Sequence, residues 1–140
     1  MAKNFLRASL AWESRAYGFT IAFWGSGALL IRSAGPPTLV EAVAYGGGAI
    51  LGFLLLTIYA YRDTLDPVNY EEPRHLILSM VHYIASLVPI IAAYFFRELQ
   101  SPYSFILTGL SVTLLYNMGM IVEANLANDA ERLEEIFFKR

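Results

Sequence analysis

The chain has 140 residues, a formal net charge of −2 and no cysteine, and 56% of its residues are hydrophobic whereas only 16% are charged. The lack of cysteine excludes disulfides, Cys-ligated zinc, iron–sulfur clusters and thiol nucleophiles. The composition also argues against a soluble domain, because such domains carry about 25% charged residues and a chain of this length has too little interior to bury several long apolar helices.

Four continuous apolar stretches account for most of the sequence. They occupy residues 16–32, 38–61, 75–96 and 103–123. About 20 helical residues cross a hydrocarbon core of about 30 Å, so each stretch is long enough to span a bilayer. We therefore expect an all-α integral membrane protein, a single domain over residues 1–140, in which four transmembrane helices form an antiparallel bundle.

The positive charges predict the orientation of this bundle. With four crossings both termini share one side of the membrane, and that side carries eight of the ten Lys and Arg residues: Lys3, Arg7, Arg15, Arg62, Arg74, Arg132, Lys139 and Arg140. The opposite side carries only Arg32 and Arg97. Under the positive-inside rule both termini are cytoplasmic. We expect the protein in the plasma membrane of a prokaryote.

The segments at the start of the chain have local signals of their own. Residues 1–15 combine apolar positions near one helical face with flanking cations, which favours a short interfacial helix; a frayed terminus is the alternative. Gly35 and the Pro36–Pro37 pair cannot continue a helix and predict a tight outer turn. Thr38 then suits the N-cap of the second helix.

Two polar segments are expected on the cytoplasmic side. Residues 62–74 contain four acids and two X-Pro steps and predict a solvated loop, with a partner-docking or cation-binding surface as the alternative. Residues 124–140 keep a helical period and predict a helical extension of the fourth crossing into the cytoplasm or along the membrane surface. Glu123, at the boundary, is expected to be solvated.

Small side chains form one stripe on each of the first two helices: Gly18, Ala22 and Gly25 on the first, and Ala44, Gly48 and Gly52 on the second. Helices associate in lipid through close backbone approach, so these stripes predict tight contact between the first and second helices. An unwound segment at residues 46–48 that lines a pore or ligand site is the functional alternative.

Polar side chains inside the predicted crossings need an explanation, because such groups are costly in hydrocarbon. The candidates form a cluster on the third and fourth helices: Ser79, His82, Ser86, Thr113 and Asn117. His82 and Asn117 fall at the same depth, where a hydrogen bond between them is expected. The cluster is either a proton-responsive or ligand-binding site or simply interhelical polar contact.

Glu41 lies one turn into the second helix, near the outer surface. A carboxylate suits the N-terminus of a helix, and Arg32 falls at a comparable level on the first helix. We therefore expect an ion pair between Arg32 and Glu41, with a cation-attracting vestibule as the functional alternative.

No catalytic, nucleotide-binding or metal-binding motif accompanies these features. The sequence predicts a non-enzymatic accessory or scaffold subunit of a membrane oligomer, with the lipid bilayer and a second copy or another membrane protein as partners. We expect no cofactor and no nucleic-acid partner. The alternative is a small homo-oligomeric channel or transporter with a polar pathway along the third helix, controlled by His82 and Asn117.

Overall fold

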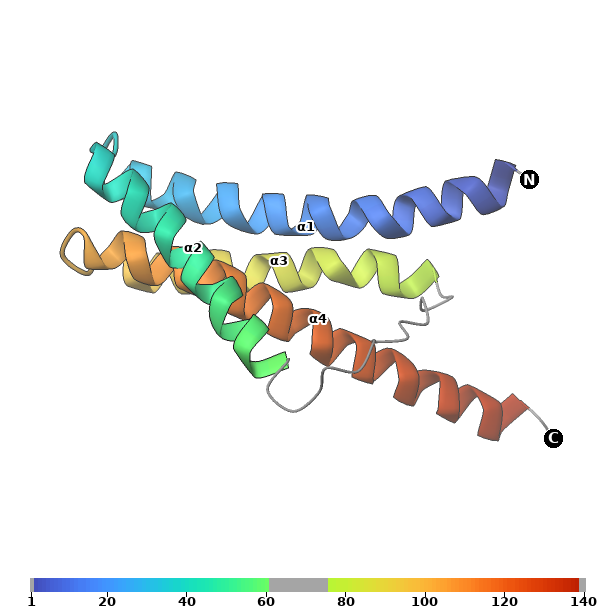
Figure 1. The fold of residues 1–140 in the computed structure, drawn as a ribbon. Coiled ribbons are helices and arrows are strands. Elements are labelled where there is room, and N and C mark those ends of the chain that lie inside the picture. The colour runs from blue at the N-terminus through green and yellow to red at the C-terminus, as the bar shows by residue number, and fades with distance from the viewer. Residues whose placement is uncertain (1, 61–75, 139–140) are drawn as a thin grey trace.

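The computed structural model describes residues 2–60 and 76–138, with side chains at positions 15–60, 83–123, 125 and 126. The described residues form four α-helices: α1 (Ala2–Ala34), α2 (Leu39–Ala60), α3 (Leu76–Phe96) and α4 (Tyr103–Phe138) (Figure 1). The all-α class is thus confirmed, and each helix contains all or most of one predicted crossing. The predicted loop at residues 62–74 lies outside the described residues.

The outer turn between α1 and α2 follows from local chemistry. Gly35 adopts a positive φ of 85° and donates its N–H to the Ile31 carbonyl at 2.8 Å, which closes the end of α1. Thr38 and Glu41 then form a capping box: the Thr38 N–H donates to Glu41 Oε2 at 2.7 Å, and the Glu41 N–H donates to Thr38 Oγ1 at 3.3 Å. The predicted N-cap is confirmed.

The first and last helices are longer than a single crossing. α1 runs without interruption over 33 residues, so no break separates a short N-terminal helix from the first predicted crossing. Residues 2–15 are thus helical, as expected, but they are not a separate short helix, because residues 2–17 contain no glycine or proline that would end it before the first crossing. α4 continues over 36 residues to Phe138, in line with the predicted helical extension.

The helices pair in an order that differs from the chain order. α1 packs on α3 and less extensively on α4, α3 packs on α4, and α2 packs on α4. In Figure 1, α1 and α3 run side by side, whereas α2 crosses α4 obliquely and diverges from α1. The two termini lie toward one end of the molecule, and the turns after α1 and α3 lie at the other.

The stripes of small residues form close helix contacts, but these contacts are not between α1 and α2. A Cβ on Gly48 would collide with the Ile106 carbonyl of α4, and one on Gly52 would lie 2.7 Å from Cβ of Thr113. On the other side of this contact, a Cβ on Gly109 would collide with the Tyr45 carbonyl of α2. The predicted close contact between the first two helices is therefore wrong: the glycine face of α2 meets α4.

The stripe on α1 also meets other partners. Ala22 is fully buried in a cluster with Ala85 of α3 and with Val112 and Tyr116 of α4. A Cβ on Gly25 would lie 2.5 Å from the end of the Ile90 side chain of α3. Gly18 is buried and Ala44 of α2 is half-buried. A stripe of small side chains favours close approach but does not specify which helix approaches.

The surface of the described bundle is apolar and its interior is small and partly polar. Exposed apolar side chains include Ile50 at 69% and Phe95 at 67% exposure, whereas Ala93 and Ser26 are fully buried. Among the described residues, two helical segments are long and apolar enough to span a membrane: Leu39–Ala60, which is all of α2, and Tyr103–Glu123 of α4. The protein is therefore an all-α four-helix protein with two candidate membrane spans.

Candidate functional site

Several polar side chains are buried inside the bundle. The buried ones among the described residues are Ser26 of α1, Ser86 of α3, and Ser104, Thr108, Ser111, Thr113 and Glu123 of α4. A buried polar group is costly unless a hydrogen bond replaces the one it makes in water. The partners of these groups therefore show which of them are structural and which are candidates for function.

Glu123 and its neighbours form the most polar of these sites, the inner polar cluster, which comprises Arg15, Tyr116, Glu123 and the backbone of Ala85. The Glu123 carboxylate is only 6% exposed and accepts the Ala85 N–H of α3 at 3.0 Å. Tyr116 is 3% exposed and donates its hydroxyl to the Arg15 carbonyl of α1 at 2.7 Å. The cluster thus connects α1, α3 and α4, with Ala85 near the middle of α3.

Two charged side chains lie near the hydrogen bonds of this cluster. Arg15 and Glu123 both lie close enough to act electrostatically on the Tyr116 hydroxyl. A carboxylate with a charge-assisted bond to a backbone N–H, near a guanidinium, can anchor three helices and can also bind a proton or a cationic group.

Glu123 was expected to be solvated because it lies at the end of an apolar stretch, and this expectation is wrong. A signal for burial was present, because Val112, Tyr116 and Glu123 are spaced by four and seven residues and so share one helical face. That face is the one that α4 turns toward the core, as the burial of all three side chains shows.

The structure divides the polar cluster predicted on the third and fourth helices. Thr113 faces α2, where its hydroxyl donates to the Ala49 carbonyl at 2.9 Å. The Asn117 amide donates to the Thr113 carbonyl at 2.7 Å and the Ser86 hydroxyl to the Tyr83 carbonyl at 2.6 Å, each within its own helix. The side chains of Ser79 and His82 lie outside the described residues, so the His82–Asn117 contact stays a prediction.

The contribution of the Thr113–Ala49 hydrogen bond to stability can be measured by comparing the buried hydroxyls of Thr113 and Thr108. Thr108 Oγ1, also fully buried in α4, has no hydrogen-bond partner within the described part of the chain. Thr113→Val is expected to lower the free energy of unfolding in detergent by about 0.6 kcal/mol, and by up to about 1.7 kcal/mol, because the Ala49 bond is lost. Thr108→Val, the matched control, should be neutral or stabilising. Equal losses in both variants would contradict the assigned hydrogen bond.

At the outer end, Glu41 has other partners than the one predicted. Its Oε2 accepts from the Thr38 N–H and hydroxyl, and its Oε1 accepts from the Ser101 hydroxyl in the turn before α4. Within the described ranges Arg32 and Glu41 form no ion pair, so that prediction is wrong. The carboxylate is taken up by the capping box and by Ser101, and it joins the start of α2 to the turn between α3 and α4.

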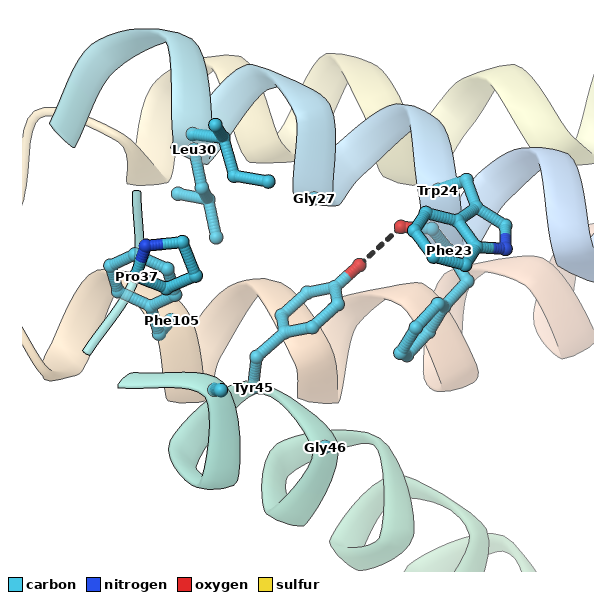
Figure 2. A pocket seen from close by; sticks show the side chains of 10 residues that line it. Phe23, Trp24, Gly27, Leu30, Pro37, Tyr45, Gly46 and Phe105 are labelled. Atoms are coloured by element: carbon cyan, nitrogen blue, oxygen red, sulfur yellow. Dashed lines mark hydrogen bonds between the residues drawn. The ribbon is translucent and has the colours of Figure 1, made fainter. Parts of the chain in front are cut away.

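An apolar cavity of about 250 Å³ lies between α1 and α2 (Figure 2). Tyr45 projects from α2 toward α1, packs its ring at a 42° tilt on that of Phe23 with centroids 4.6 Å apart, and donates its hydroxyl to the Phe23 carbonyl. The lining residues are Phe23, Trp24, Gly27, Leu30, Ile31, Pro37, Ala42, Tyr45, Gly46 and Phe105. Sequence reasoning missed this cavity, because it depends on how far α2 stands from α1.

Among the described residues, no three His, Cys, Asp or Glu side chains are grouped so that they could hold a metal ion. Comparison with known proteins gives no match to a family model, a curated protein or a solved structure. The case for function therefore depends on the geometry of this chain.

Proposed function

We propose that this chain is an integral membrane protein with four crossings and both termini in the cytoplasm, and that it serves as a non-catalytic accessory or scaffold subunit of a membrane oligomer. The observation that carries the proposal is the distribution of side chains: many large apolar groups face outward on all four helices, while four serines, two threonines and Glu123 are buried. This arrangement is unfavourable in water and favourable in hydrocarbon.

The position of α2 supports the subunit role. This helix packs on α4, and the face turned away from α4 is exposed and apolar, with Val43, Ile50 and Leu54 among its side chains. Ile50, on this face, is 69% exposed and leaves an apolar surface that another helix can cover.

The absence of native cysteine makes the orientation directly testable. Single cysteines at Ser33, in the last turn of α1, and at Gln100, between α3 and α4, are expected to react with a membrane-impermeant maleimide on intact cells. A cysteine at Ala2 should react only after the membrane is opened. Labelling of the two outer positions from opposite sides, or a protein that stays dissolved without detergent, would contradict the proposal.

The subunit role is tested by crosslinking in native membranes. Ile50→Cys on the exposed face of α2 is expected to form a crosslinked species with a second copy or another membrane protein when an oxidant is added. Ala93→Cys is the control, because Ala93 is fully buried within the bundle and cannot reach a neighbour. Two results together would argue against a subunit role: neither variant forms a crosslinked species, and the protein extracted in mild detergent is a monodisperse monomer.

Transport is the second candidate function, and the buried carboxylate of Glu123 favours it. An ionisable group at membrane depth is a candidate for an ion or proton pathway. Proteoliposomes should then show a proton or cation flux that falls in Glu123→Gln and in His82→Ala. Equal flux in empty liposomes and in all three protein preparations would leave the scaffold role as the better explanation.

A further inference from the structure

The walls of the cavity between α1 and α2 select an apolar occupant. Of the ten lining side chains, only those of Tyr45 and Trp24 carry a polar atom, and the Tyr45 hydroxyl already donates to the Phe23 carbonyl. A charged or strongly polar molecule would lose its hydration there without gaining partners. Apolar cavities of about 150 Å³ are known to take up benzene, so a cavity of 250 Å³ is large enough for an apolar group.

The cavity is held open by Tyr45 and is not merely a packing defect. Tyr45 spans from α2 to the α1 backbone, while Gly27, Ala42 and Gly46 leave the space on either side unfilled (Figure 2). A Cβ at Gly46 would meet nothing within 4 Å, although this glycine lines the cavity. Larger side chains would therefore fit, and an empty space of this kind forfeits dispersion contacts.

The shape and exposure of the cavity match a hydrocarbon chain. Its lining on α1 extends from Phe23 to Ile31, which is about 12 Å along the helix axis at the helical rise. Trp24 and Ile31, both lining residues, are also 70% and 47% exposed, so the cavity is continuous with the apolar outer surface. A bilayer would present acyl chains to this surface at high concentration.

We infer that the cavity binds one acyl chain of a bilayer phospholipid, which fills the space between α1 and α2 and holds α2 at its distance from α1. This inference rests on the membrane location proposed above. A lipid in this position would be part of the folded protein, because its chain would replace contacts that the two helices do not make with each other. An isoprenoid chain has the same chemistry, and the experiment must separate the two sources.

Two glycines on adjacent positions of α2 give a matched pair of variants. Gly46 lines the cavity and Gly47 does not, and both have open space where a Cβ would stand. Gly46→Leu should fill the cavity, whereas Gly47→Leu should add the same side chain outside it. Ala42→Leu, from another lining position, provides a second cavity-filling variant if Gly46→Leu does not fold.

The variants are purified in mild detergent and examined by native mass spectrometry and thermal unfolding. Wild type and Gly47→Leu are expected to retain one phospholipid per protomer, and their unfolding midpoint should rise when a palmitoyl-oleoyl phosphatidylglycerol is added. Gly46→Leu is expected to lose the retained lipid and the response to added lipid. A long-chain isoprenoid alcohol, added in a parallel arm, should not replace the phospholipid.

Three results would overturn the inference: retention of lipid by Gly46→Leu at the wild-type level, no retained lipid in wild type, or stabilisation by the isoprenoid alcohol alone. A carbonate wash of the membranes separates this failure from failure of the proposed location. If the protein stays with the membranes but retains no phospholipid, only the lipid site is wrong. If wild type is released by the wash, the membrane location is wrong as well.

Discussion

Gly109→Ala is expected to separate α2 from α4 and to lower the free energy of unfolding by about 3 kcal/mol or more, at or above the upper end of the range for overpacked cores. The added Cβ would collide with the Tyr45 carbonyl oxygen and lie 3.1 Å from the Ala49 nitrogen. Because both obstacles are backbone atoms, no rotation of a side chain can relieve the collision. The measurement is thermal or denaturant-induced unfolding in detergent, followed by circular dichroism.

Gly47→Ala is the matched control for this variant. Its Cβ would meet nothing within 4 Å, and alanine favours the helix over glycine by roughly 0.5–1 kcal/mol. This control should therefore be neutral or slightly stabilising, opposite in sign to Gly109→Ala. Similar stabilities of the two variants would mean that α2 and α4 do not approach as closely as the structure has them.

Glu123→Ala is expected to have the second largest effect, a loss of about 2–3 kcal/mol. The substitution leaves the Ala85 N–H of α3 without the carboxylate that accepts it and removes the negative charge near Arg15 and Tyr116. Hydrogen bonds to charged groups contribute more to stability than hydrogen bonds between neutral groups. Unfolding in detergent again provides the measurement.

Two controls separate the hydrogen bond from the charge. Glu123→Gln keeps an acceptor for the Ala85 N–H and is expected to lose less stability than Glu123→Ala. Glu98→Ala removes an exposed carboxylate that pairs only with its neighbour Arg97, and it should leave stability unchanged. If Glu123→Ala is as harmless as Glu98→Ala, then Glu123 is solvated and the inner polar cluster does not hold the helices together.

The limits of the helices were predictable because they depend on local signals. Gly35 and the following prolines end α1, and the capping box of Thr38 and Glu41 starts α2 within one residue of the predicted position. The continuity of α1 was not predicted, because a change from charged to apolar composition near residue 15 suggested a boundary. Composition changes where a helix enters another medium, but the backbone hydrogen bonds need not.

Helix pairing could not be predicted in the same way. The stripes on α1 and α2 are compatible with each other, yet Gly48 and Gly52 pack against α4 through Gly109 and Thr113. Stripes of small residues occur on α1, α2 and α4. Which two of these helices pair depends on the packing of all four helices together. The aromatic contact of Tyr45 with Phe23, which holds α1 and α2 apart, has no signature in the spacing of either helix.

The candidate site was found only in part for the same reason. Thr113 was correctly placed inside the protein, but its partner is the Ala49 carbonyl of α2 rather than a side chain of α3. Glu123 was judged from its position at the end of an apolar stretch, whereas its direction follows from the helical face that it shares with Tyr116. For both residues, the helix face that carries the side chain determines its partner, and the position along the helix does not.

The pairing of α2 with α4 has a consequence for biosynthesis. A ribosome completes α2 more than forty residues before it begins α4, at Tyr103, so the glycines at 48 and 52 emerge without the surface that covers them. During that interval the second helix is held by its connection to α1 and by aromatic contacts such as that of Tyr45 with Phe23. A nascent chain that stops before residue 103 therefore carries an uncovered glycine face on α2.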